Sequence, residues 1–273
     1  MELVGQEAVE EISLGTVVNI LEDAPSTWCE QVAFARQLKG INHVELWLEF
    51  IPTGSSLEQL GDLVDGLDLT VHAPFVDVNL SSQWNEMAQL SLRKTQAALS
   101  VANLLGAHVF TIHSGKCAVY EERDTALRRL ASQLRQLRQE TDVIVAVENV
   151  KAKRSGVSLE VVARSVDVER LLEIQPDARI TIDVAHAVQN GDDPWDVVER
   201  FGGHIASVHV HDVRADGRSH APLGTGRLHL NELGAAMSSM PARFLTLETL
   251  GEIDTKNSWE TLSRLAISGT VAR

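Results

Sequence analysis

The sequence contains few cysteines, few basic residues and no long apolar run, and each scarcity argues against a class of protein. Its two cysteines, Cys29 and Cys117, are far apart and form no CxxC pair. This argues against a disulfide framework or a thiolate zinc knuckle and favours a reducing compartment. No apolar stretch approaches the roughly 18 residues of a membrane span, and the acidic N-terminus lacks the apolar core of a signal peptide. We therefore expect a cytoplasmic protein without a membrane partner.

Basic residues are outnumbered, because 24 Lys and Arg stand against 38 Asp and Glu, a formal net charge of −14. The imbalance favours solubility and argues against a general nucleic-acid-coating role, although a local basic site remains compatible with it. A hydrophobic fraction of 44% with 23% charged residues is that of a globular protein.

Strand-like and helical segments alternate along the chain. Strand patterns occur at residues 12–18, 43–49, 68–72, 108–113, 143–148, 180–183, 204–210 and 243–248. Helical spacing or caps mark residues 25–38, 86–105, 127–137, 161–173, 194–200, 230–240 and 259–267. Eight such units predict an α/β protein with a closed (β/α)8 TIM barrel, as a single domain over residues 1–273. A doubly wound open sheet is the alternative, but no glycine-rich phosphate loop follows the first strand.

The last six predicted strands all end in a residue that can bind a divalent cation. In a parallel barrel these ends point to one face, where the βα loops build the active site. Burying carboxylates and imidazoles unpaired costs several kcal/mol each, and a central cation removes that cost. The six residues predict a metal site: His72, His113, Glu148, Asp183, His209 and Glu248.

These ligands offer nitrogen and oxygen only, which suits manganese, zinc, cobalt, iron or magnesium and argues against copper or iron–sulfur clusters. Glu148 and Glu248 come from distant strands, so they are placed to flank a substrate as acid and base. Three more histidines lie just beyond strand ends, where they would orient substrate or hold another ion: His186, His211 and His220.

Loop residues on the same face suggest what the site binds. The positively charged ones are Lys116, Lys151, Lys153, Arg154, Arg214, Arg218 and Arg227. They indicate an anionic substrate group such as phosphate, or they are ordinary solvated loop residues, and the two interpretations are equally supported. Trp47, Phe75 and Trp84 are placed to stack on a sugar, although core packing is favoured for Trp47.

Seven strings in chain order carry a resemblance to a known family. They are Val71-His-Ala-Pro-Phe75, Ile112-His-Ser-Gly115, Val147-Glu-Asn149, Ile182-Asp-Val-Ala-His186, His209-Val-His-Asp212, Pro222-Leu-Gly-Thr-Gly226 and Leu247-Glu248. The chain resembles the xylose isomerase-like TIM-barrel superfamily, which includes sugar phosphate isomerases/epimerases and type IV apurinic endonucleases. The resemblance runs from the third strand to the eighth.

In the epimerase branch, the resemblance implies one metal held by Glu148, Asp183, His209 and Glu248. The two glutamates would move a proton through an enediolate intermediate, and His186 would place a substrate oxygen. We expect His211, Lys151, Arg218 and Phe75 to contact the substrate, a small sugar or sugar phosphate. An oligomer is compatible with the sequence.

In the endonuclease branch, the resemblance implies up to three ions and a nucleic-acid substrate. His72 and His113 would join Glu148 around a second ion, while His186 and His220 would hold a third. The third site also needs an aspartate two residues before His220, where this chain has Arg218. This departure and the net charge favour the isomerase or epimerase over the phosphoesterase. A non-catalytic metal-binding barrel is the third hypothesis.

Overall fold

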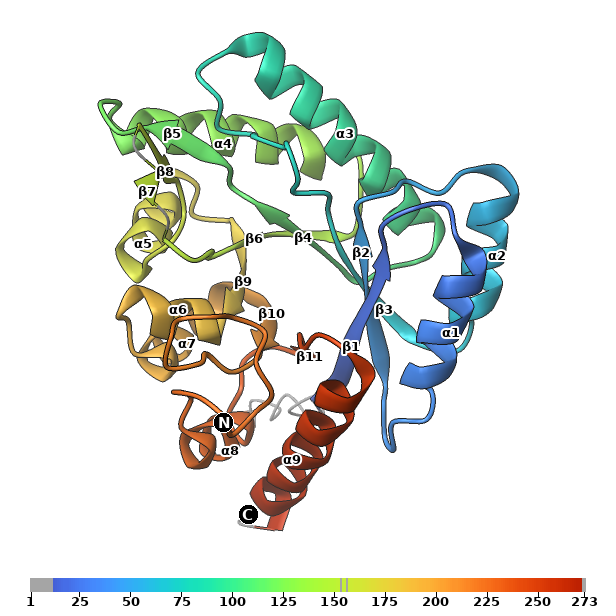
Figure 1. Cartoon of the computed structure of the whole chain (residues 1–273). Coiled ribbons are helices and arrows are strands. Elements are labelled where there is room, and N and C mark those ends of the chain that lie inside the picture. The colour runs from blue at the N-terminus through green and yellow to red at the C-terminus, as the bar shows by residue number, and fades with distance from the viewer. Residues whose placement is uncertain (1–11, 153, 156, 272–273) are drawn as a thin grey trace, which may run out of the picture.

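The computed structural model describes residues 12–152, 154–155 and 157–271. Eight parallel strands close into a barrel in the order β1-β11-β10-β9-β6-β4-β3-β2 (Figure 1). They are β1 Ser13–Ile20, β2 His43–Leu48, β3 Asp68–His72, β4 Val109–His113, β6 Ile144–Glu148, β9 Arg179–Asp183, β10 Ile205–Val210 and β11 Phe244–Leu247. The eight strands predicted from the sequence and the TIM barrel are thus confirmed.

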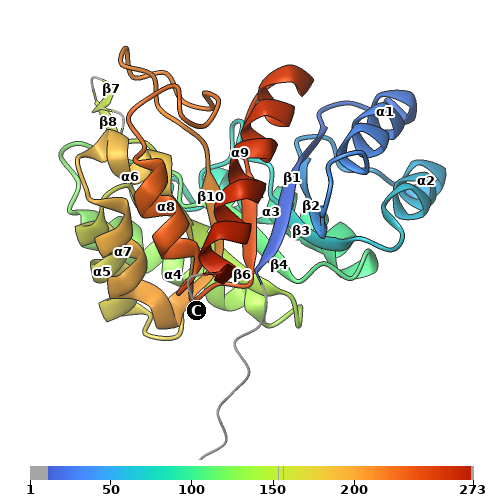
Figure 2. The same ribbon diagram turned by 90° about the horizontal axis from the view of Figure 1, so that it is seen from below.

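Helices connect these strands and lie outside them, as Figure 2 shows from below. They are α1 Pro25–Ala35, α2 Gly54–Val64, α3 Asn85–Leu104, α4 Arg123–Arg138, α5 Ser165–Ile174, α6 Val184–Asn190, α7 Pro194–Phe201, α8 Leu230–Met237 and α9 Glu252–Val271, with a 3-10 turn at Gly202–His204. None of the described helices has both the length and the hydropathy that a membrane span requires.

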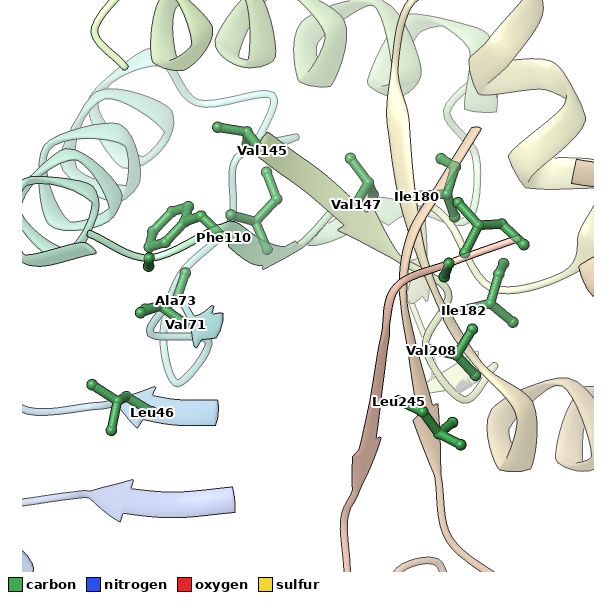
Figure 3. Close-up of a cluster of buried hydrophobic side chains, with 14 of the residues drawn as sticks. Leu46, Val71, Ala73, Phe110, Val145, Val147, Ile180, Ile182, Val208 and Leu245 are labelled. Carbon is green, nitrogen blue, oxygen red and sulfur yellow. The ribbon is translucent and has the colours of Figure 1, made fainter. Parts of the chain in front are cut away.

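The two faces of each barrel strand differ in chemistry because successive side chains point to opposite sides. Outward side chains are aliphatic or aromatic and pack under the helices; Figure 3 shows Leu46, Val71, Phe110, Val147 and Ile182 from this layer. Inward side chains include many buried hydroxyls, imidazoles and carboxylates, such as those of Thr70, Thr111, His209 and Glu45. The apolar outer layer therefore stabilises the barrel, while the inner layer is left for polar groups.

Local structure departs from the sequence-based expectations at three places. Helix α2 fills the connection after β2, where no helix was predicted, and it buries Leu60 and Val64. His186 lies in the first turn of helix α6, where no helix was predicted. The carboxylate of Asp183 caps this helix by accepting the His186 N–H at 2.8 Å. Strands β5 Lys116–Ala118, β8 Ser158–Glu160 and β7 Arg154–Ser155 form a small separate sheet.

Candidate metal centre

The barrel register brings the strand-end residues to one level. His113 pairs with Glu148 across β4 and β6, and His209 pairs with Asp183 across β10 and β9. All of the six predicted ligands are buried except His113, whose side chain is 27% exposed. Because the parallel strands end at the same level, their carboxylates and imidazoles lie close together and are shielded from solvent.

Glu148 lies between four imidazoles. Its Oε2 accepts hydrogen bonds at 3.0 Å from His72 Nε2 and at 3.0 Å from His113 Nε2. Its Oε1 lies 3.5 Å from His186 Nδ1 and 3.7 Å from His209 Nδ1. Burial disfavours the charged carboxylate, but these imidazoles, His113 foremost, outweigh it and hold the pKa of Glu148 well below its usual range.

Asp183 contacts two imidazoles, and one of them, His186, also lies beside Glu148. Its Oδ2 lies 3.0 Å from His186 Nδ1 and 3.1 Å from His211 Nε2. Burial alone would lower the pKa of His186, but the carboxylates of Asp183 and Glu148 outweigh it and raise that pKa to about 9. His186 is therefore a cation at neutral pH when no metal competes for these carboxylates.

The surroundings of His209 are those of a metal ligand. Its Nδ1 lies 2.8 Å from Glu248 Oε1, yet the orientation gives no hydrogen bond, and both buried atoms lack a hydrogen-bond partner. Unpartnered buried polar atoms are costly, and two such atoms from a histidine and a glutamate suit a shared cation. Glu148 Oε1 lies 3.7 Å from the same nitrogen, so the three residues offer the nitrogen and oxygen donors that suit a divalent ion.

Four groups among the described residues have ligand atoms close enough together for a cation. They are His72, His113 and Glu148; Asp183, His186 and His211; His211, His220 and Glu248; and Glu45, His209 and Glu248. His72 Nδ1 lies 2.8 Å from the Ala73 carbonyl, which directs its Nε2 at Glu148. His211 Nδ1 lies 3.0 Å from the backbone nitrogen of His220 and 3.1 Å from the Asp212 carbonyl, while its Nε2 lies 3.1 Å from Asp183 Oδ2. The backbone of His220 is left-handed, with φ +55°.

A cavity of about 680 Å³ opens above the cluster. Aromatic rings form one wall: Trp47 lies 5.7 Å from the His72 ring and 6.1 Å from the Phe75 ring, between centroids. Trp84 does not line the cavity and is 68% exposed. Another cavity, of about 650 Å³, lies around the other strand ends, beside His108 and Phe244, and contains none of the predicted site residues.

The predicted cationic residues differ in position. Lys151 lines the cavity and donates from Nζ to the Gly217 carbonyl at 2.8 Å, and Lys116 lines it 3.7 Å from Glu160. Arg218 is 73% exposed and binds Asp216, so it does not reach the cavity in this conformation. Arg214 and Arg227 do not line the cavity either. Lys153 lies outside the described residues, as does the side chain of Arg154.

One residue of the site was missed from the sequence. Glu45, in the middle of β2, is fully buried, and its Oε2 lies 3.1 Å from His209 Nε2. The sequence interpretation considered strand ends from the third strand onward, and Glu45 lies inside the second. A charged residue within an otherwise apolar strand pattern is the signal that would have identified it.

Comparisons with known proteins agree with this architecture. The family model described as "Xylose isomerase-like TIM barrel" matches residues 32–267. The uncharacterized protein MJ1614 of Methanocaldococcus jannaschii is 27% identical over 178 residues, 62% of this chain and 66% of its own length. The chain thus spans just under two thirds of this relative.

Solved structures of similar shape include proteins named for sugar epimerases. A D-tagatose 3-epimerase-like protein superimposes with a TM-score of 0.80 at 19% identity, covering 96% of this chain and 99% of the other. An L-ribulose 3-epimerase gives a TM-score of 0.76 at 14% identity, covering 96% of each chain. At these identities the likeness establishes the fold, while the family match spans most of the sequence. The chain belongs to the xylose isomerase-like TIM barrel family.

Proposed function

We propose that this protein is a divalent-metal-dependent isomerase or epimerase of a small sugar or sugar phosphate. One observation carries the proposal: His209 Nδ1 and Glu248 Oε1 form an unpartnered pair beside Glu148, and both glutamates line an aromatic-walled cavity. Glu148, Asp183, His209 and Glu248 would hold the ion, with manganese or zinc the first candidates. When bound, the ion would supply a Lewis acid that acidifies the carbon beside a sugar carbonyl.

The two glutamates then serve as proton carriers. Glu148 and Glu248 approach His209 Nδ1 at 3.7 Å and 2.8 Å from different strands. Each can accept or return a proton at a carbon held between them, which inverts that carbon or moves the carbonyl along the chain. Their low exposure keeps water from returning the proton first.

Other residues orient the substrate. His186 has Nδ1 within 3.1 Å of Asn149 O and 3.0 Å of Asp183 Oδ2, so Nε2 is the ring nitrogen that would form a hydrogen bond with a substrate oxygen. Trp47 and Phe75 offer apolar faces to a sugar ring or chain. Lys151 is the lining cation best placed for a phosphate or another anionic group.

The test is proton exchange in heavy water. Metal-loaded protein is incubated with a panel of ketoses, aldoses and their phosphates, and NMR follows deuterium entry beside the carbonyl together with the new isomer. Glu148→Gln and Glu248→Gln should each reduce isomer formation by about 10²- to 10⁴-fold, the usual contribution of one acid or base. Glu140→Gln, which alters an exposed carboxylate bound to Gln96, serves as the control. Wild-type turnover in both glutamate variants would refute the proposal.

A metal-dependent phosphoesterase related to the type IV apurinic endonucleases is the second candidate. The observation that favours it is the group formed by His72, His113 and Glu148, which would suit a second ion. Metal content separates the two candidates, since the isomerase needs one ion per chain and the phosphoesterase two or three. Protein with two or more zinc ions that cleaves abasic DNA, with binding that weakens steeply in salt, would favour this candidate over the first.

A further inference from the structure

Glu45 is a buried carboxylate with no part in the proposed proton transfer. Its Oε2 accepts hydrogen bonds from Thr70 Oγ1 at 2.9 Å and His209 Nε2 at 3.1 Å, and its Oε1 accepts one from Trp47 Nε1 at 3.2 Å. Its exposed fraction is 0%. A carboxylate removed from water destabilises the fold unless its partners compensate, so the contacts of Glu45 must account for its presence in the barrel interior.

The carboxylate determines which nitrogen of His209 carries a proton. The other contacts of this carboxylate are with donors, because Trp47 Nε1 can only donate and Thr70 Oγ1 donates to Oε2. A carboxylate only accepts hydrogen bonds, so His209 Nε2 is the donor in the third contact. The other ring nitrogen, Nδ1, is then directed at Glu248 Oε1, 2.8 Å away.

We infer that Glu45 is a positioning residue, which holds His209 with its proton on Nε2 and its Nδ1 lone pair toward the cation site. The inference rests on the metal site of the proposed function. A carboxylate on the far nitrogen of a ligand histidine fixes the ring and increases its basicity, and both effects strengthen metal binding. Glu45, His209 and Glu248 also have ligand atoms close enough for one cation. Glu45, however, contacts Nε2, the ring nitrogen opposite the one that faces Glu248, so an ion bound at Nδ1 would lie across the ring from Glu45.

The contacts of Glu45 also predict what an isosteric replacement does. Both carboxylate oxygens accept hydrogen bonds, so the amide nitrogen of a glutamine must face a donor on one side or the other. If the amide oxygen stays with His209, the proton remains on Nε2 but the ionic partner is lost. If the amide nitrogen faces His209, the proton is displaced toward Nδ1, where it competes with the metal. Either arrangement weakens the ligand.

A double-mutant cycle on metal affinity tests the inference. Dissociation constants for zinc and cobalt are measured by competition with a chromophoric chelator for wild type, Glu45→Gln, His209→Ala and the double variant. We expect Glu45→Gln to weaken binding by about 10- to 100-fold in the wild-type background and to have no further effect without His209. Asp167→Asn, which removes a buried carboxylate paired with Arg123, should leave the affinity unchanged.

Several results would overturn the inference. Wild-type affinity in Glu45→Gln would do so, and so would an equal loss in both backgrounds, since a general structural role acts with or without His209. If Glu45→Gln does not fold, NMR of zinc-loaded wild type with ¹⁵N-histidine decides instead. The His209 signals, assigned by their loss in His209→Ala, must report a proton on Nε2 and the metal on Nδ1. The reverse assignment overturns the inference, as does wild-type protein that binds no divalent ion.

Failure of the proposed function would be distinguishable. If the wild type binds metal but isomerises no sugar, the reaction assignment is wrong, whereas the affinity cycle still decides the role of Glu45.

Discussion

His43, at the start of β2, should make the barrel sensitive to mild acid. Its ring is completely buried, with Nδ1 3.1 Å from Ser13 Oγ and Nε2 3.0 Å from Thr246 Oγ1. Burial is the largest effect on this ring and lowers the pKa of His43 from 6.5 to about 4, despite the opposing charges of Glu45 and Asp68. The folded protein therefore holds this imidazole neutral.

The sign and size of the effect follow from linkage. Between pH 4 and 6.5 the unfolded chain binds a proton at His43 that the folded chain does not, so the free energy of unfolding rises with pH in this window. Stability from the neutral ring is complete above pH 6.5 and is lost as the pH falls toward 4. At pH 5 the loss is about 2 kcal/mol for these two pKa values.

The assay is urea unfolding of chelator-treated protein at pH 8 and pH 5, for wild type and His43→Gln. Glutamine keeps hydrogen-bonding groups near Ser13 and Thr246 but does not titrate. All other titrating groups act in both proteins, so the wild type should lose about 2 kcal/mol more than the variant between the two pH values. Equal losses in the two proteins would refute the assignment of His43 as a buried neutral histidine.

Three further predictions concern the same interior. Gly15→Ala should lower the free energy of unfolding in urea by about 3 kcal/mol, because a Cβ would lie 2.3 to 2.4 Å from atoms of the His43 ring. A variant that unfolds at the same urea concentration as the wild type would contradict this prediction. Removal of the metal with a chelator should lower the melting temperature in calorimetry. Adding the metal back at 100 times its dissociation constant should raise the free energy of unfolding by about 2.7 kcal/mol. An unchanged melting temperature would argue against a metal site in the folded protein. His72→Ala should keep isomerase turnover within about tenfold of the wild-type value, because His72 is not among the four proposed metal ligands Glu148, Asp183, His209 and Glu248. A loss of 10³-fold or more would favour the two-metal phosphoesterase.

The sequence predicted the barrel and the strand-end residues for the same physical reason. Parallel strands in alternation with helices bring all their carboxyl ends to one face, so the chain order alone indicates that Glu148, Asp183 and Glu248 meet. The contacts among these groups could not be predicted from the sequence. That His209 turns one nitrogen to Glu45 and the other to Glu248 depends on the register of β2, β10 and β11 around the closed barrel.

Shorter features escaped prediction because their causes are local or tertiary. The small sheet of β5, β7 and β8 has strands of two or three residues, too short for a periodic pattern. Helix α6 begins at Val184, and Asp183 before it is both the helix N-cap and a candidate ligand; from the sequence we predicted only the ligand role. Arg218 was expected at the substrate, but Asp216, two residues away in the same loop, binds it at 2.8 Å.

The buried polar groups form a connected chain that explains why the barrel tolerates them. Ser13 contacts His43, His43 contacts Thr246, and the Thr246 hydroxyl lies 3.5 Å from Glu45 Oε2, which binds His209. Each member of this chain has a partner except at its upper end, where His209 Nδ1 and Glu248 Oε1 lack one. Leaving two atoms unpaired in an otherwise satisfied buried network is costly. A cation would accept a lone pair from each of these two atoms and so remove that cost. The position of this unsatisfied pair, beneath the cavity and beside Glu148, is therefore the strongest structural support for the proposal that this end of the barrel binds a cation.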